Sequence, residues 1–132
     1  MAWIKGTRYS DKINGTASND IIEGFSGHDL IYGLAGNDDI YGGSGDDDLY
    51  GGSGDDDLYG GSGWDYMAGG TGNDRYFVDS PGDEVAELSG EGTDTVHTIL
   101  SSYRLPLHVE NLIYDGYGRF SGTGNSLANA IY

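Results

Sequence analysis

Aspartate is the residue type whose spacing in this sequence points to shared chemistry. Eight aspartates recur at intervals of nine residues: Asp11, Asp20, Asp29, Asp38, Asp47, Asp56, Asp65 and Asp74. From Ile13 to Asp74 the chain carries thirteen acidic residues and no lysine or arginine, so its own side chains cannot neutralise these carboxylates. Such a segment either stays disordered through self-repulsion or is completed by cations from solution. The pattern therefore predicts cation binding.

The aspartates belong to a repeat that also sets glycine and apolar positions. A glycine precedes each aspartate by five residues, at Gly6, Gly15, Gly24, Gly33, Gly42, Gly51, Gly60 and Gly69. A large apolar or aromatic residue follows each aspartate by two, at Ile13, Ile22, Ile31, Ile40, Leu49, Leu58, Met67 and Tyr76. The last three residues of a repeat, such as 48–50, alternate as a short strand whose middle side chain points inward. The six glycine-rich residues before them are expected to turn the chain back.

Two such repeats make one coil, so residues eighteen apart should stack directly above one another. We therefore expect an all-β fold, a right-handed parallel β-roll (β-solenoid). Carboxylates stacked at the strand spacing of about 4.8 Å would repel one another, and a divalent cation between them would reverse the sign of that interaction. The available ligand atoms are all oxygens, which favours calcium over zinc or copper. Magnesium is less suited, because it prefers a tighter octahedral geometry and retains its waters.

The clearest repeats, GGSGDDDLY at 42–50 and again at 51–59, match the pattern G-G-x-G-x-D-x-U-x. Through this pattern the segment 6–77 resembles the RTX (haemolysin-type) calcium-binding nonapeptide repeat family. The resemblance implies that each calcium ion lies between turns of neighbouring coils and takes an aspartate from both turns and carbonyl oxygens from the backbone. Besides the eight aspartates, the predicted ligands are the carbonyls of Gly27, Gly36, Gly42, Ser44, Gly45, Gly51, Ser53, Gly54, Gly60, Ser62, Gly69 and Thr71.

These ligands predict about four to six calcium ions for the chain. The regular sites pair Asp29 with Asp47, Asp38 with Asp56, Asp47 with Asp65, and Asp56 with Asp74. Two weaker sites pair Asp11 with Asp29 and Asp20 with Asp38, because Tyr9 and Ser18 stand where the fourth-position glycine belongs. Phe25 and Leu34 likewise replace the second glycine, and a side chain there resists the backbone angles that the turn requires.

The sequence divides into a β-roll of about eight repeats at 1–77 and a segment at 78–132 that loses the period. The second segment should form a β-rich C-terminal cap over the last coil, since solenoid ends need one. It has strand-like stretches at 93–105 and 109–115, and Gly124, Asn129 and Ile131 read as the start of a further repeat. Asp79, Asp83, Glu91 and Asp94 could form one more calcium site. At the other end, Trp3 and Ile4 are expected to shield the first coil.

The function that the resemblance implies is a calcium-binding module that folds on binding calcium and stabilises a secreted bacterial protein after type I secretion from a Gram-negative cell. Its expected location is extracellular, as part of a larger protein. The chain has no cysteine for disulfides or thiolate zinc sites. It has no apolar run long enough to span a bilayer and no basic surface for nucleic acid. It also has no nucleophile–base pattern, so we expect no enzyme activity.

An alternative is a carbohydrate-binding or adhesive module of a polysaccharide-modifying enzyme or a surface adhesin. Tyr32, Tyr41, Tyr50 and Tyr59 occupy the ninth position of successive repeats, so Tyr32 should stack near Tyr50 and Tyr41 near Tyr59. Such rows could bind sugar rings, although cross-strand packing of aromatic pairs is the more common explanation.

Overall fold

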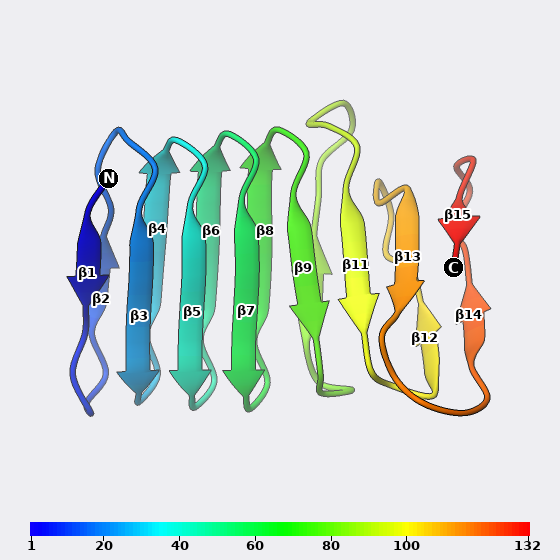
Figure 1. Ribbon diagram of the computed structural model, residues 1–132, viewed down its shortest axis with the longest axis horizontal. Coiled ribbons are helices and arrows are strands. Elements are labelled where there is room, and N and C mark those ends of the chain that lie inside the picture. Colours follow the sequence, from blue (N-terminus) through cyan, green and yellow to red (C-terminus); the bar gives the residue numbers. More distant parts are fainter.

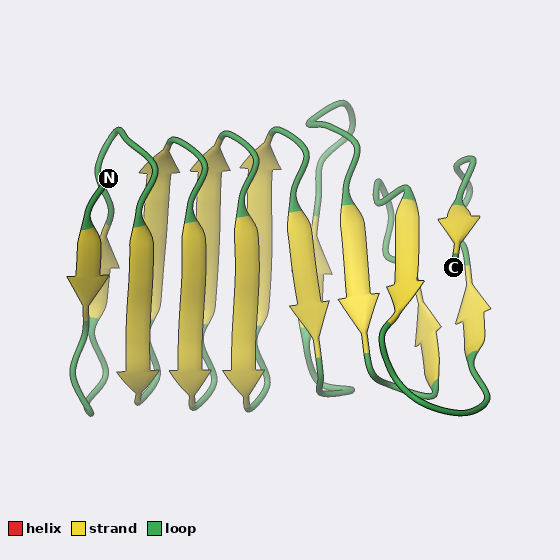
Figure 2. Cartoon of the chain, in the orientation of Figure 1, coloured by secondary structure: helices red, strands yellow, loops and turns green.

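The computed structural model covers residues 1–132 and contains only strands and turns. Every strand pair is parallel, and the chain winds through about seven turns of a β-solenoid, which confirms the predicted β-roll (Figures 1 and 2). The elongated molecule carries its N-terminus at one end and its C-terminus at the other (Figure 1). No helix is present that could cross a membrane by its length and apolar character.

Two sheets form the walls of the roll, and consecutive strands alternate between them. The front sheet in Figure 1 holds β1 (Trp3–Lys5), β3 (Ile21–Ser26), β5 (Asp39–Ser44), β7 (Asp57–Ser62), β9 (Arg75–Val78), β11 (Thr95–Thr98), β13 (Asn111–Tyr114) and β15 (Ala130–Ile131). The back sheet holds β2 (Lys12–Asn14), β4 (Leu30–Ala35), β6 (Asp48–Ser53), β8 (Tyr66–Thr71) and β10 (Glu84–Ala86). A separate pair consists of β12 (Ser102–Arg104) and β14 (Ser121–Thr123).

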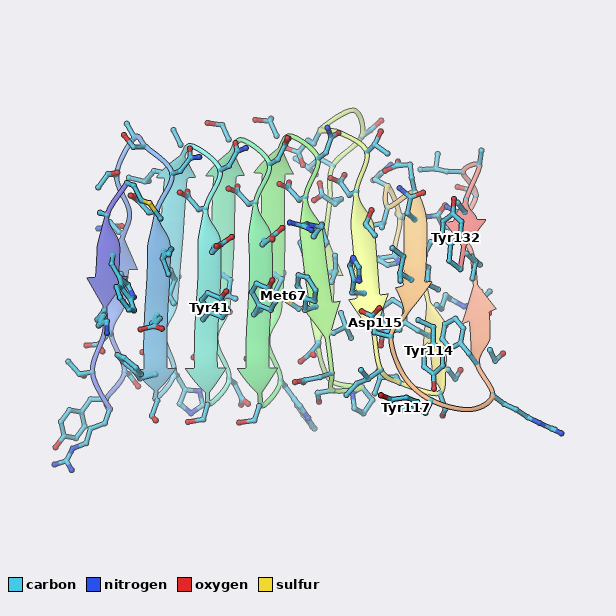
Figure 3. The ribbon with its side chains drawn as sticks, viewed as in Figure 1. Tyr41, Met67, Tyr114, Asp115, Tyr117 and Tyr132 are labelled. Carbon is cyan, nitrogen blue, oxygen red and sulfur yellow. The ribbon has the colours of Figure 1, made fainter.

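The predicted register of eighteen residues per coil is confirmed by the pairing of Ile31 with Leu49 and of Leu49 with Met67. The apolar residue at position eight of every repeat points between the sheets, and these eight side chains are 0–7% exposed. Figure 3 shows the contrast between Met67, which is part of this core, and Tyr41, on the outer face of the front sheet. The alternation of the repeat therefore builds a core one side chain wide.

The strands are longer than the sequence predicts. The regular strands, such as Asp48–Ser53, contain six residues, whereas the repeat predicts strands of three. Their second half is the glycine-rich stretch, where the main chains of neighbouring coils pack so closely that a Cβ on Gly52 would overlap the Leu34 carbonyl oxygen. Glycine has low strand propensity, so the prediction assigned these residues to the turn. Here the absence of a side chain instead allows the ladder to continue.

Strand pairing continues beyond residue 77. Strand β10 pairs with β8, β11 pairs with β9, and β13 pairs with β11, all in parallel. The strands predicted within 93–105 and 109–115 are present as β11 and β13, and Ile131 stacks on Leu112 as the start of a repeat requires. A capping role for 78–132 stays a prediction. At the N-terminal end Ile4 packs against the core, whereas Trp3 is 64% exposed and shields nothing.

Candidate metal centre

The predicted aspartates form two rows, one along each edge of the roll. Strands of the front sheet run downward in Figure 1, so the aspartates that precede them lie along the upper edge, and those that precede the back strands lie along the lower edge. We call them the upper ladder, which consists of Asp20, Asp38, Asp56, Asp74 and Asp94, and the lower ladder, which consists of Asp11, Asp29, Asp47, Asp65 and Asp83.

In every ladder aspartate except Asp11, one carboxylate oxygen accepts a hydrogen bond from the preceding coil and so holds the coils together. The Oδ1 atom of Asp47 accepts a hydrogen bond of 2.8 Å from the backbone N–H of Asp29, one coil earlier. The same bond joins Asp38 to Asp56 at 2.8 Å and Asp56 to Asp74 at 2.8 Å. This bond orients each carboxylate and directs its second oxygen toward its own turn.

The second oxygen has no partner in the regular turns. The Oδ2 atoms of six ladder aspartates are buried and accept no hydrogen bond: Asp29, Asp38, Asp47, Asp56, Asp65 and Asp74. These residues are only 0–2% exposed. A buried carboxylate oxygen without a donor or cation is costly, because burial removes its hydration. Each regular turn thus contains a buried carboxylate oxygen that a bound cation would stabilise.

Each unpartnered oxygen borders a space that only a glycine leaves open. A Cβ added to Gly42 would lie 2.6 Å from Asp47 Oδ2 and 2.6 Å from the carbonyl oxygen of Gly60 in the next coil. The same arrangement surrounds Gly33, where an added Cβ would lie 2.5 Å from Asp38 Oδ2 and 2.5 Å from the Gly51 carbonyl oxygen. The structure therefore brings a carboxylate oxygen and a predicted carbonyl ligand together at position one of the repeat.

The other predicted carbonyl ligands stack along the same edges. The N–H of Gly27 donates to the Ser44 carbonyl oxygen at 2.9 Å, and that of Gly36 donates to the Ser53 carbonyl oxygen at 2.9 Å. Gly45 and Gly54 repeat these bonds to Ser62 and Thr71. A carbonyl oxygen has two lone pairs, so each acceptor keeps one for an ion. Hard oxygen donors from carboxylates and carbonyls are the set that calcium prefers, and the residues present fit that ion.

The electrostatics agree with this geometry. Burial raises the pKa of Asp38 to about 6 and the pKa values of Asp56, Asp65 and Asp74 to about 7, and neighbouring carboxylates raise them further against the effect of the backbone N–H donors. Burial likewise raises the pKa of Asp29 and Asp47. A metal-free roll at neutral pH must therefore hold protons or repel itself, and bound cations would remove both costs.

The first two turns satisfy their aspartates without a cation. The backbone N–H and the hydroxyl of Thr16 both donate to Asp20 Oδ2 at 2.7 Å. Thr7 does the same for Asp11 Oδ2, at 2.6 and 2.8 Å. Burial raises the pKa of Asp20, but the bonds from Thr16 and from the Ala2 N–H outweigh it and bring the pKa below its usual value. The threonine at position two of these repeats, where later repeats have phenylalanine, leucine or glycine, was the sequence signal for this difference.

Phe25 and Leu34 adopt the left-handed backbone conformation that the second glycine has in later turns. Their φ angles are 78° and 82°, against 113° and 117° for Gly43 and Gly52 one coil later. The side chains thus do not prevent the turn, but they make it strained.

Two acidic residues of the second segment extend the ladders. The Asp65 N–H donates to Asp83 Oδ1 at 3.1 Å on the lower edge, and the Asp74 N–H donates to Asp94 Oδ1 at 2.8 Å on the upper edge. The grouping of Asp79, Asp83, Glu91 and Asp94 into one site was therefore wrong, because the two ladders lie at opposite edges of the roll. The loss of the nine-residue period after residue 77 concealed these positions.

The tyrosine rows stack as predicted. The ring centroids of Tyr32 and Tyr50 are 5.0 Å apart, and those of Tyr41 and Tyr59 are 4.6 Å apart with an interplanar angle of 9°. The second row continues through Phe77 to His97. Within a row the rings cover one another's faces, so only their edges and the two ends of the row remain open to a ligand.

The sequence profile described as the RTX calcium-binding nonapeptide repeat (4 copies) matches residues 5–40 and 41–76. No curated protein and no solved structure matches the chain. The matched residues cover more than half of the chain and end within β9, before the turns that carry Asp83 and Asp94.

Proposed function

The chain belongs to the RTX calcium-binding nonapeptide repeat family, and on that basis we propose that it folds as calcium fills its turns and stabilises a larger secreted protein. It is a calcium-binding β-roll module, since RTX repeats bind calcium and the fold is the β-roll. The observation that carries the folding proposal is the row of six buried aspartate Oδ2 atoms without a hydrogen-bond donor.

The proposed ligands are the aspartates of the regular turns together with the carbonyls that border them. Asp29, Asp38, Asp47, Asp56, Asp65 and Asp74 each offer a free oxygen, and each faces a position-one glycine. Asp11 and Asp20 offer none, because Thr7 and Thr16 occupy theirs. The structure thus supports the four regular pairings more strongly than the two early ones.

Bound calcium would supply positive charge at fixed points between the coils. The N–H donors of the preceding coil orient the aspartates for calcium binding, and the glycines keep the space beside each carboxylate free of side chains. Metal-dependent domains of this kind couple binding to folding, because the ligands come together only in the fold. The low calcium concentration of a cytoplasm would then keep the chain unfolded for export, and extracellular calcium would fold it.

We also propose secretion by a type I route and an extracellular location, and what supports this is that members of the family are typically secreted bacterial proteins. RTX repeats are structural calcium-binding modules, and we propose that this chain likewise has no catalytic activity of its own. The alternative of carbohydrate binding stays a prediction. A hollow of about 210 Å³ beside Tyr59, Phe77 and His97 favours it, but the mutual stacking of these rings leaves few faces for a sugar.

A calcium titration of the chain tests the proposal directly. We expect a disordered circular dichroism spectrum in excess chelator, a β-rich spectrum as calcium is added, and reversal when chelator returns. Magnesium at equal concentration is the control, and we expect it to be far less effective because it demands a tighter octahedral shell. A β-rich spectrum that persists in chelator would refute the coupling of folding to calcium, and failure to bind calcium in equilibrium dialysis would refute the function itself.

A further inference from the structure

The turn between β10 and β11 replaces the regular turn with a different set of residues. Ala86 pairs with Ala68, so the next residue, Glu87, takes the place that Gly69 has one coil earlier. The step from Asp74 to Asp94 along the upper ladder is twenty residues, two more than elsewhere. A glutamate therefore enters the turn at the position that is glycine in every regular repeat.

Three acidic side chains meet in this turn. One carboxylate oxygen each from Asp74, Glu87 and Asp94 can be chosen so that all lie within 4.8 Å of one another. The residues are 1%, 7% and 1% exposed. We propose that Asp74, Glu87 and Asp94 form a calcium site of their own, which closes the end of the upper ladder and which the nonapeptide pattern does not encode. This site rests on the proposed function, because it extends calcium binding to a turn outside the repeats.

Two of the three residues in this cluster have an unpartnered carboxylate oxygen. Asp74 Oδ2 and Glu87 Oε2 are buried and have no hydrogen-bond partner, and both residues are more than nine-tenths buried. Two other oxygens of the cluster have partners: Asp94 Oδ1 accepts the Asp74 N–H at 2.8 Å, and Glu87 Oε1 accepts the hydroxyl of Tyr76. Two buried oxygens without a donor, in carboxylates that lie this close together, are what a cation would be needed to satisfy.

Tyr76 is placed to hold Glu87 toward the cluster. It fills position eight, where the other repeats have aliphatic residues or methionine, and its hydroxyl also accepts the N–H of Gly69 at 2.6 Å. That bond leaves the hydroxyl proton free to be donated to Glu87. The tyrosine is fully buried, so its hydroxyl requires such partners.

The charge balance of the turn favours a cation from solution. Burial, followed by the neighbouring carboxylates, raises the pKa of Glu87 to about 9, that of Asp74 to about 7 and that of Asp94 to about 6. Arg75, the nearest base along the chain, pairs with Asp57 on the outer face instead. Because three carboxylates converge here rather than two, we expect this site to fill before the regular ones.

An ion has a route to the cluster. A hollow of about 290 Å³ lies on the outer side of β6, β8 and β10, and its lining includes Glu87, Glu91, Tyr50 and Tyr66. Glu91 folds over the same turn and accepts the Leu88 N–H at 2.9 Å. Glu87 therefore connects the buried cluster to a hollow at the surface of the roll.

The test counts the calcium ions bound to the whole chain by native mass spectrometry and follows binding by calorimetry. Glu87→Gln removes one charge with little change of shape, and we expect it to bind one ion fewer and to lose the tightest binding step. Glu84→Gln is the matched control, since Glu84 is exposed and lies three residues earlier. We expect Glu84→Gln to keep the wild-type count.

A second measurement does not depend on the folding of a variant. Anomalous scattering from wild-type crystals grown with calcium should show an ion between Asp74, Glu87 and Asp94. If the cluster is instead held by shared protons, the crystal will show ions between the regular turns and none here, and the count for Glu87→Gln will equal the wild-type count. Either result overturns this site while leaving the proposed function intact, whereas a wild-type chain that binds no calcium at all would overturn the proposed function.

Discussion

Replacement of Leu34 by glycine should leave the folded roll more stable than replacement by alanine. Leu34 has a φ of 82° at a position where the next coil of the same sheet has Gly52, with a φ of 117°. An L-residue in the left-handed region brings its Cβ too close to the following carbonyl oxygen, at a cost of about 1–2 kcal/mol. Glycine has no such penalty, so the substitution relieves strain in the native state.

The surrounding hydrogen bonds show where this strain lies. The N–H of Ala35, directly after Leu34, reaches the Thr16 carbonyl oxygen at 3.4 Å, whereas the next N–H, that of Gly36, reaches the Ser53 carbonyl oxygen at 2.9 Å. The Leu34 side chain is 50% exposed, so its removal also loses half-buried area, and this loss is nearly the same for glycine and alanine variants. The greater entropy of glycine in the unfolded chain offsets about 0.5–1 kcal/mol relative to alanine, which leaves an expected advantage of glycine over alanine of about 0.5–1 kcal/mol.

Thermal unfolding in saturating calcium is the appropriate assay. A difference of 1 kcal/mol shifts the Tm of a chain of this size by about 2–8 °C, so we expect Leu34→Gly to unfold a few degrees above Leu34→Ala. Alanine is the matched comparison, because it removes the same side-chain atoms beyond Cβ and keeps the Cβ that causes the strain. If the two variants unfolded at the same temperature, or if glycine unfolded below alanine, the strain would not be where we place it.

Two further predictions concern the ladders. Asp56→Asn should lower the number of calcium ions bound in native mass spectrometry by one or two, because Asp56 is assigned to two sites. Asp48→Asn is the control: it removes the same charge from an exposed residue and should leave the number of bound ions unchanged. Equal numbers of bound ions for both variants would contradict the assignment. In chelator, the raised pKa values of about 7 for Asp56 and Asp65 mean that the folded chain binds more protons than the unfolded chain between about pH 4 and 7. Stability of the metal-free fold should therefore rise as the pH falls through that range, and a circular dichroism spectrum that gains no β signal between pH 8 and pH 5 would speak against it.

The regular part of the fold could be predicted because one period determines several structural quantities at once. An interval of nine residues that fixes Asp47 and Leu49 also fixes the coil of eighteen residues, the inward side chain and the alignment of Asp47 with Asp29 and Asp65. Strand length was not predictable in the same way. Glycine at positions one and two signals a turn by propensity, and only the packing of neighbouring main chains shows that it continues the strand.

The ends of the ladders could be predicted only in part. Asp83 keeps the spacing of eighteen from Asp65, but it lies in a turn that contains Pro81 and none of the expected glycines. Asp94 lies twenty residues from Asp74, so the interval of eighteen residues does not predict its position. Glu87 had no signal of its own, because it keeps the spacing of eighteen from Gly69 but replaces the glycine that marks this position in the repeats.

The need for a cation differs along the roll, and the differences follow from single residues. Threonine at position two gives Asp20 two donors, and its pKa falls. Glycine at the same position in later repeats gives Asp56 none, and its pKa rises to about 7. In the first two turns, hydrogen-bond donors of the chain therefore satisfy the aspartates, whereas the aspartates of the middle turns depend on cations from solution. One residue at position two thus sets how strongly a turn depends on calcium, although the N–H donor of the preceding coil binds the aspartate of both kinds of turn in the same way.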